Sequence, residues 1–163
     1  MLKPNLVSPD PRCTTKPEVI KTLALIMKNA GREVCIGEGS AAAPGFNLDE
    51  EGIYFTRDPE LLDPMQQYVF DQLGYTALAT SLDIPLINLH TGEMVNIDVP
   101  DPFVFSRLTV HRSLHDIDLL CSVPMMKTHV LATVTLGMKN LIGLYPGKAY
   151  CTVRSCVHND SAA

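Results

Sequence analysis

The segment TTKPEVIKTLALIMKNAG, residues 14–31, decides the fold, because it predicts one amphipathic helix between two strand-like stretches. Thr15, followed three residues later by Glu18, has the spacing of a capping box. Pro17 suits the first helical turn, and Gly31 suits the C-terminal stop. Apolar side chains recur at helical spacing along the segment. The expected buried face consists of Val19, Ile20, Leu23, Met27 and Ala30.

Short strand-like stretches flank this helix, LKPNLV at residues 2–7 and EVCIGEGS at residues 33–40. A strand, a helix and a second strand joined by short links form a βαβ unit, in which the two strands are parallel and the crossover is right-handed. Pro4 has no N–H for a ladder hydrogen bond, so the first strand ends there or lies at a sheet edge. A strand this short makes a poor sheet member, and we expect the natural chain to begin earlier.

The rest of the chain continues the alternation of helices and strands. Residues 41–63 lack a period and predict a long connection, which is followed by a helix over residues 63–75. Strands are predicted around residues 85–89, 93–100, 108–111 and 117–124. A last helix is predicted over residues 128–143, with a face made of Leu131, Val134, Thr135, Met138 and Ile142.

We therefore expect a single α/β domain over residues 1–163 that is truncated at both ends. Its sheet should be mostly parallel and Rossmann-like, with flanking helices. The strands predicted in the middle of the chain suit an antiparallel hairpin added to that sheet.

The composition is that of an ordered globular protein, with 46% hydrophobic and 19% charged residues. The net charge of −5 disfavours nucleic acid as a partner, since phosphate backbones are bound by clustered Lys and Arg. No apolar run approaches the ~18 residues that a membrane span needs. The amino-terminal stretch has no signal-peptide pattern. The sequence therefore predicts a cytoplasmic protein without a membrane or nucleic-acid partner.

The five cysteines are irregularly spaced, which argues against a disulfide framework. Cys35 and Cys121 lie in apolar strand-like runs and are expected to be buried thiols. Cys151, Cys156 and His158 offer metal-binding side chains, but their spacing matches no standard zinc or iron–sulfur pattern. An irregular C-terminal segment is the simpler interpretation of these residues.

Charged and polar residues interrupt the apolar run VPMMKTHVLATVTLGMKNLIG, residues 123–143. These residues are Lys127, His129, Lys139 and Asn140. Charged side chains are rarely placed in apolar surroundings unless a partner or ligand accompanies them. The run therefore points to a site.

Other polar residues follow the predicted strands. Ligands of open α/β sheets bind beyond the carboxyl ends of the strands. Lys3 and Asn5 lie at the end of the first strand, and Glu38 lies at the end of the second. Lys127 and His129 come after the strand over residues 117–124. The topology should bring these side chains to one edge of the sheet.

We predict at this edge a site for a small anionic or metal-bearing ligand, whose metal and cofactor the sequence does not specify. The candidate catalytic residues are Lys127, His129 and Lys139. The candidate ligand-binding residues are Lys3, Asn5, Thr15, Glu38 and Asn140. Each has a structural alternative: Thr15 as a helix cap, His129 as a satisfied structural histidine, and Lys139 as a lysine whose charged end reaches water.

The stretches LKPNLV, TTKPEVI, GEGS and MMKTHVLATVTLGMKNLIGLYPGK, together with His158, resemble the prokaryotic family called domain of unknown function three-six-two. The resemblance covers nearly the whole chain and implies an α/β domain that begins before residue 3 and continues beyond residue 158. It singles out Lys3, Asn5, Thr15, Glu38, Lys127, His129, Lys139, Asn140 and His158. Many members also carry a ferredoxin-like iron–sulfur module, but this chain has no C-x-x-C-x-x-C run.

Three hypotheses follow. In the first, the domain is an enzyme or part of one: Lys127 and Lys139 hold a carboxylate or phosphate, His129 is an acid, base or ligand, and Glu38 is a base or ligand. In the second, the domain is a redox-associated module that docks an iron–sulfur domain or partner through an exposed apolar patch near residues 94–105. In the third, it is a non-functional fragment with an open sheet edge.

Overall fold

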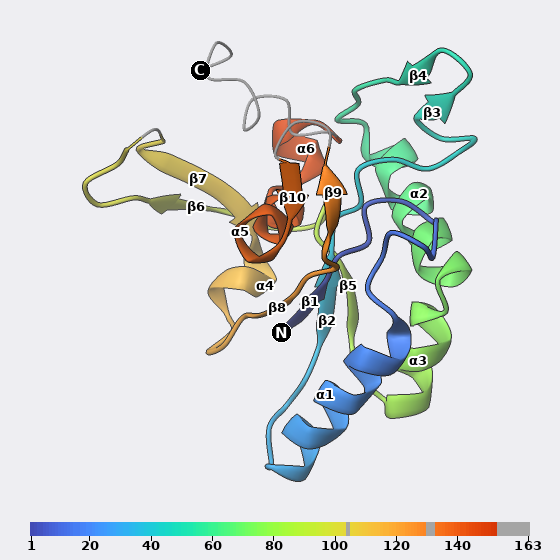
Figure 1. The fold of residues 1–163 in the computed structure, drawn as a ribbon. Coiled ribbons are helices and arrows are strands. Elements are labelled where there is room, and N and C mark those ends of the chain that lie inside the picture. Colours follow the sequence, from blue (N-terminus) through green and yellow to red (C-terminus); the bar gives the residue numbers. More distant parts are fainter. Residues whose placement is uncertain (104, 130–132, 153–163) are drawn as a thin grey trace.

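The centre of the protein is a parallel sheet of four strands in the order β5–β2–β1–β8 (Figure 1). The computed structural model describes residues 1–103, 105–129 and 133–152. The strands of this sheet are β1 (Leu2–Pro4), β2 (Ile36–Glu38), β5 (Leu86–Asn88) and β8 (Cys121–Val123). Helices pack against the sheet and small antiparallel hairpins are attached to it, so the α/β prediction is confirmed.

Strand β1 lies inside the sheet although it has only three residues. Leu2 is in register with Ile36 on one side and with Cys121 on the other. Pro4 ends the strand, as the sequence predicts, so its missing N–H interrupts no further ladder. The expectation that so short a strand makes a poor sheet member is wrong, because parallel neighbours flank β1 on both sides and all three residues are buried.

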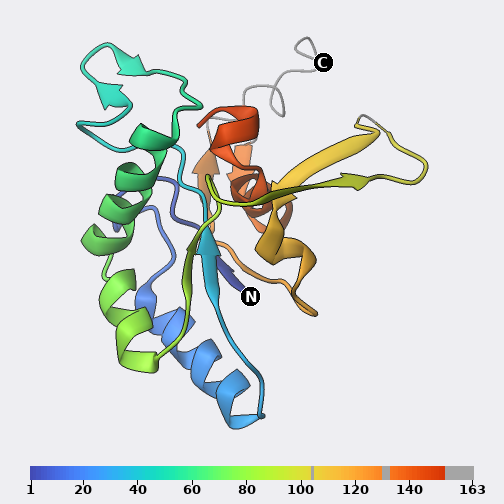
Figure 2. The same ribbon diagram turned by 180° about the vertical axis from the view of Figure 1, so that it is seen from behind.

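Three helices cover one face of the sheet (Figures 1 and 2). They are α1 (Pro17–Asn29), α2 (Pro59–Gln72) and α3 (Tyr75–Leu82). The apolar core lies between this layer and the strands, where Leu2 and Ile36 meet Ile20, Ala24 and Phe70. No helix in the described ranges is both long enough and apolar enough to cross a membrane.

Helix α1 differs from its sequence prediction at the amino end. Its N-cap is Lys16, which makes no side-chain capping bond, so the capping box expected at Thr15 is wrong. The buried face is centred on Ile20 and Ala24, and Val19 is 46% exposed. The expected stop at Gly31 is confirmed, since its φ of 74° is a left-handed conformation that glycine adopts without strain.

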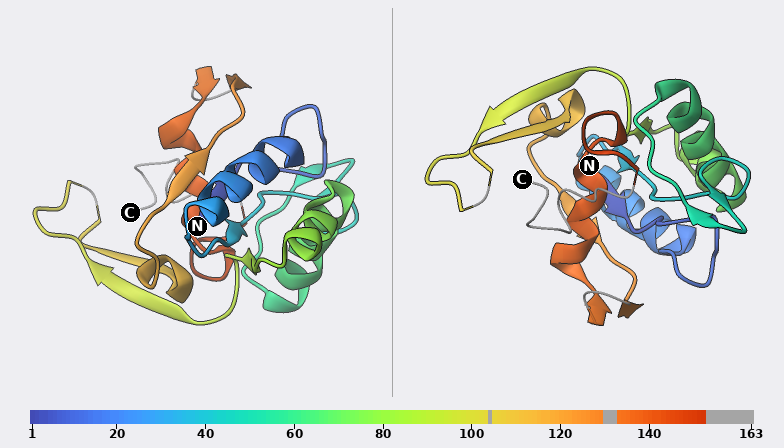
Figure 3. Two further views of the ribbon diagram at one scale, coloured as in Figure 1. Left: turned by 90° about the horizontal axis from the view of Figure 1, so that it is seen from below. Right: turned by 90° about the horizontal axis from the view of Figure 1, so that it is seen from above.

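The predicted hairpin in the middle of the chain is present. Strand β6 (Met94–Asp98) pairs antiparallel with β7 (Arg107–His111), and the short helix α4 (Arg112–His115) follows. The long connection before α2 contains a smaller hairpin of β3 (Leu48–Asp49) and β4 (Gly52–Ile53). Figure 3 shows the β6–β7 hairpin standing out from the body of the protein.

The helix predicted over residues 128–143 is wrong. Strand β9 (Lys127–His129) pairs antiparallel with β10 (Thr133–Thr135), and only Gly137–Asn140 forms a short helix, α5. The β-branched Thr and Val residues of this segment favour a pleated conformation over a helix. Met138, expected on the buried face, is 87% exposed. The 3₁₀ helix η1 (Leu141–Leu144) and helix α6 (Gly147–Tyr150) follow.

Candidate functional site

A buried ion pair joins the carboxyl ends of the two central strands. The Nζ atom of Lys3 in β1 lies 2.8 Å from both carboxylate oxygens of Glu38 in β2. The two side chains are only 1% and 3% exposed. A charge buried to this degree is tolerated only when it is paired and hydrogen-bonded.

The Glu38 carboxylate has two further donors besides Lys3. Its Oε2 atom accepts a hydrogen bond of 2.9 Å from the backbone N–H of Leu6, and its Oε1 atom accepts one of 2.8 Å from that of Gly39. Together with the ammonium group, these backbone donors replace the water that the carboxylate loses on burial. Glu38 is therefore held by its neighbours on all sides and does not face an open cleft.

Asn140 brings the short helix α5 onto this ion pair. Its Oδ1 atom accepts hydrogen bonds of 3.1 Å from Lys3 Nζ and 3.1 Å from Asn5 Nδ2. Its Nδ2 group donates to the Lys3 carbonyl at 3.2 Å and to Ser122 Oγ at 3.0 Å. The amide uses four hydrogen bonds and is 1% exposed, so Asn140 ties α5 to β1 and β8.

Asn5 links this buried network to Lys127. Its Nδ2 group donates to Asn140, and its Oδ1 atom accepts a hydrogen bond of 2.7 Å from Lys127 Nζ. Its backbone N–H donates to Thr15 Oγ1 at 2.9 Å. The hydroxyl of Thr15 in turn donates to the Val123 carbonyl at 2.7 Å. Thr15 thus joins the loop after β1 to the end of β8 instead of capping α1.

Lys127 is half-buried at the start of β9. Its ammonium group donates to two carbonyl oxygens, Asn5 Oδ1 and the backbone oxygen of Cys13. Burial lowers the pKa of Lys127 below its ordinary value, while negative charge on Cys13 and Glu38 opposes part of that shift. Within the described part of the chain, the third N–H of the Lys127 ammonium group has no hydrogen-bond acceptor.

His129 and Lys139 complete the group of basic side chains. Burial lowers the pKa of His129, and the positive charges of Lys139 and Lys127 lower it further. Burial also lowers the pKa of Lys139. Lys127 and His129 are two residues apart in β9, so their side chains lie on the same face of the strand. The three residues form what we call the basic cluster: Lys127, His129 and Lys139.

The structure thus joins six of the sequence-predicted residues in one hydrogen-bonded network, namely Lys3, Asn5, Thr15, Glu38, Lys127 and Asn140. His129 and Lys139 are coupled to this network through their charges. Cys156 and His158 lie outside the described residues. Cys151 is described, and its Sγ atom accepts a hydrogen bond of 3.0 Å from Arg57 Nε.

Sequence reasoning missed a second buried polar group beside the network. His90 follows β5 and is fully buried. Its Nδ1 atom accepts a hydrogen bond of 3.1 Å from the backbone N–H of Gly147, so Nε2 carries the proton and donates to the Ser40 carbonyl at 2.7 Å. The signal in the sequence was a histidine directly after the strand predicted over residues 85–89, at the same edge as Glu38.

The role of Gly143 was also not predicted from the sequence. It was expected to end a helix, but it lies in η1 over the ion pair. A Cβ atom built on Gly143 would overlap Glu38 Oε1 and would lie 2.8 Å from Lys3 Nζ. Glycine is therefore required here by space, and the backbone of η1 closes directly over the buried charges.

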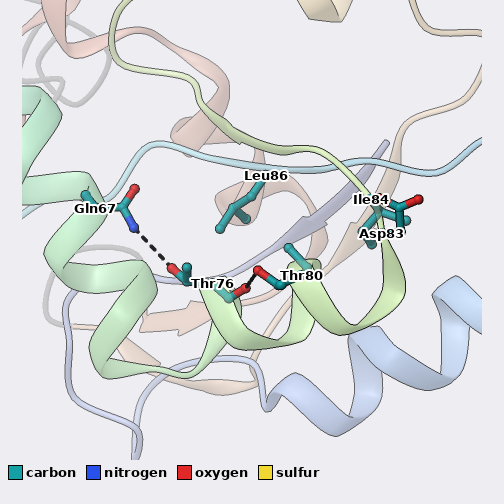
Figure 4. A pocket seen from close by; sticks show the side chains of 7 residues that line it. Gln67, Thr76, Thr80, Asp83, Ile84 and Leu86 are labelled. Carbon is teal, nitrogen blue, oxygen red and sulfur yellow. Dashed lines mark hydrogen bonds between the residues drawn. The ribbon is translucent and has the colours of Figure 1, made fainter.

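Two surface depressions lie away from the basic cluster. One, of about 400 Å³, is formed by α2, α3 and the edge strand β5, and Gln67 donates a hydrogen bond of 3.1 Å to Thr76 at its wall (Figure 4). The other, of about 1030 Å³, lies at the amino ends of the strands and is lined by residues such as Met27 and Cys35. Neither is lined by the basic cluster, and we base the site on the converging polar side chains.

The fold and the network define an α/β domain with a closed polar network and basic side chains at the carboxyl edge of its sheet. Residues 1–161 match the family model described as "Domain of unknown function (DUF362)", and the chain belongs to that family. It is 28% identical over 151 residues to the "Thylakoid-associated protein sll1697" of Synechocystis sp.. That match covers 91% of this chain but 39% of the relative. No solved structure gives a significant match.

Proposed function

We propose that the domain binds a small anion through the basic cluster, Lys127, His129 and Lys139, at the carboxyl edge of the sheet. The observation that carries the proposal is the environment of His129, whose pKa is lowered by burial and then further by the positive charges of Lys139 and Lys127. Positive charge therefore accumulates around one imidazole. An anion placed there interacts favourably with all three groups.

The nearby carboxylate of Glu38 is already engaged. It receives the Lys3 ammonium and two backbone N–H groups. The charges of Lys3 and Glu38 largely cancel each other at longer range. Glu38 therefore has a positioning role in this proposal instead of the role of a base.

The network orients Lys127 through a chain of hydrogen bonds. Asn140 Oδ1 accepts one hydrogen bond from Lys3 Nζ and a second from Asn5 Nδ2. The opposite end of the Asn5 amide, its Oδ1 atom, then faces Lys127. The buried ion pair and Asn140 therefore determine which end of the Asn5 amide meets the basic cluster.

The same electrostatics favour an anion over a metal ion. A cation would be repelled by Lys127 and Lys139, and His129 would have to remain neutral to bind it. A carboxylate or phosphate meets no such repulsion, and its oxygens suit lysine and imidazolium donors. We therefore place a small carboxylate or phosphate, rather than a metal, in the proposed site.

Titration with inorganic phosphate tests this function. The signal of the His129 imidazole is followed by NMR as phosphate is added at constant ionic strength. We expect a saturable shift that Lys127→Met and Lys139→Met each weaken. Lys21→Met, which removes an exposed lysine of α1, should leave the shift unchanged. Equal weakening by Lys21→Met would show a general charge effect and would contradict the proposal.

A second candidate function is the docking of a partner through the β6–β7 hairpin. Phe103 at its end is fully exposed, and Ile97 is 39% exposed. Exposed apolar side chains on a projecting element mark many protein contacts. A ferredoxin with iron–sulfur clusters is the probe for the redox-associated version. Saturable shifts of hairpin NMR signals that Phe103→Ser removes would support docking, and unchanged signals would oppose it.

A further inference from the structure

Helix α1 has an exposed apolar side in addition to its buried one. Ile20 and Ala24 face the core between the helices and the sheet. Val19 and Ile26 are about two helical turns apart, so they share another side of the helix. Val19 is half-exposed and Ile26 is 60% exposed. The helix therefore carries apolar side chains that the core of its own chain does not bury.

The contact between Lys28 and α3 shows which way this second apolar side of α1 points. Lys28 donates a hydrogen bond to the Leu82 carbonyl at the end of α3. Val19 and Lys28 are about two and a half helical turns apart, so Val19 lies on the side of α1 away from α3. In Figures 1 and 3, α3 and β8 lie on opposite sides of α1. Val19 and Ile26 therefore lie toward the edge of the sheet that β8 forms.

A depression joins the end of α1 to the start of β8. It is the larger of the two surface depressions, with a volume of about 1030 Å³, and it lies at the amino ends of the strands. Met27 of α1 and residues 116–119, which precede β8, both line it, together with apolar side chains such as Val34. Leu119 is 63% exposed. This end of the sheet edge therefore offers an open apolar hollow.

The other end of β8 presents an exposed apolar side chain. Met126 follows β8 at the carboxyl ends of the strands and is 72% exposed. The flexible side chain of methionine fills apolar hollows of irregular shape. Met126 and the depression lie at opposite ends of the same strand, so a second copy of the chain, turned end over end, brings a Met126 to each depression.

The charges at the two ends of this edge are of opposite sign. The start of α1 lies at the end of β8, where Thr15 donates to the Val123 carbonyl. Lys16 and Lys127 belong to this end, and Asp118 belongs to the end at the depression. Neighbouring opposite charges offset each other at the remaining positions of that end, which are Arg32, Glu33, Arg112 and Asp116. An antiparallel second copy therefore places the basic end of one edge against the acidic end of the other.

We propose that this edge is the interface of a twofold-symmetric dimer, in which α1 and β8 of one copy pack against α1 and β8 of a second copy that runs in the opposite direction. Val19 and Ile26 of the two copies pack together at the centre. Met126 of each copy enters the depression of the other, and Lys16 of each lies opposite Asp118 of the other. Such an interface is isologous, because one self-complementary surface supplies both halves of every contact.

Sedimentation velocity of the intact chain at increasing concentration tests the proposal, and we expect a dimer. Ile26→Lys and Met126→Lys each place a charge in the apolar part of the interface and should raise the dimer Kd roughly tenfold or more. Ile53→Lys makes the same change on the β3–β4 hairpin, at a side chain that is also exposed, and is the matched control. Since all three residues are exposed within one copy, circular dichroism should show each variant folded.

A charge reversal gives a second and independent measurement. Lys16→Asp and Asp118→Lys each place like charges opposite one another and should weaken the dimer. The double variant should regain affinity, because opposite charges face each other again. A structural effect of either substitution would not be rescued in this way.

The remaining outcomes overturn the proposal. A chain that is monomeric at every concentration leaves this edge to another occupant, such as an additional segment of a longer family member. A dimer that neither Ile26→Lys nor Met126→Lys weakens has its interface elsewhere. A dimer that Ile53→Lys weakens to the same extent reflects general charge repulsion.

Discussion

Asn5 and Lys127 lie 122 residues apart in the chain and are joined by a hydrogen bond of 2.7 Å from Nζ to Oδ1. The bond spans two elements, the loop after β1 and the start of β9. The other end of the Asn5 amide donates to Asn140 at 3.1 Å, which holds the amide in one orientation. The lysine therefore faces an oxygen that carries no formal charge.

Asn5→Asp should convert this neutral contact into an ion pair. The new carboxylate should raise the pKa of Lys127 and weaken phosphate binding, because it competes with the ligand for the same ammonium group. An NMR pH titration of the Lys127 side chain reports the first effect, and the His129 NMR titration with phosphate reports the second. Asn29→Asp adds the same charge at an exposed position of α1 and is the control. Equal effects of the two variants would contradict the assignment of Asn5.

The Lys3–Glu38 pair should dominate the stability of this edge. Glu38→Gln leaves a buried ammonium group without its charge partner, and the free energy of unfolding should fall by about 3–5 kcal/mol, measured by urea denaturation. A double variant, Lys3→Met with Glu38→Gln, should recover part of that loss. Asp98→Asn breaks the exposed pair with Arg107, whose side chains are 78% and 62% exposed, and should leave the urea midpoint unchanged.

Gly143→Ala should destabilise the domain although alanine is the better helix former. The added methyl group overlaps Glu38 Oε1, and that carboxylate is held by several hydrogen bonds and has no space to withdraw. Overpacking of this kind typically reduces the free energy of unfolding by about 1–3 kcal/mol. Gly137→Ala meets no atom within 4 Å and is the matched control. Thermal denaturation of both variants is the measurement, and equal melting temperatures would falsify the close packing of η1.

His129 should titrate below the ordinary pKa of histidine. Its pKa is lowered in the folded state, so between the folded and unfolded pKa values the unfolded chain binds the additional proton. Stability should therefore decrease as pH falls through the unfolded value toward the folded one. NMR titration of the imidazole is the measurement, and Lys139→Met should move the pKa upward. A bound anion should move it upward as well, which couples binding to proton uptake.

The sequence predicted the parallel sheet, α1 and the β6–β7 hairpin because each depends on how apolar residues are spaced along a short segment. The apolar spacing of α1 is helical, and the alternation in β6 is that of a strand. The segment over residues 128–143 failed for the same reason. Its apolar residues fit a helical period, but Thr133 and Thr135 belong to a strand paired with β9, and tertiary pairing outweighed the period.

The polar network was predicted as a set of residues but not as a set of bonds. Topology placed Lys3 and Glu38 at one edge, since parallel strands end on the same side. The role of Thr15 was misjudged, because its partner Val123 is 108 residues away and a local capping pattern was at hand. His90 and Gly143 were missed because burial and close backbone approach depend on the assembled fold.

The position of β1 between β2 and β8 has a consequence for how the protein is made. Lys3 and Glu38 are synthesised before Ser122 and Asn140, which enclose them and follow about one hundred residues later in the chain, at ≈ 5–20 residues per second. The emerging chain must keep a short first strand unpaired on one side for several seconds. Completion of this edge of the sheet is therefore a late, long-range step in folding, which only the last part of the described chain makes possible.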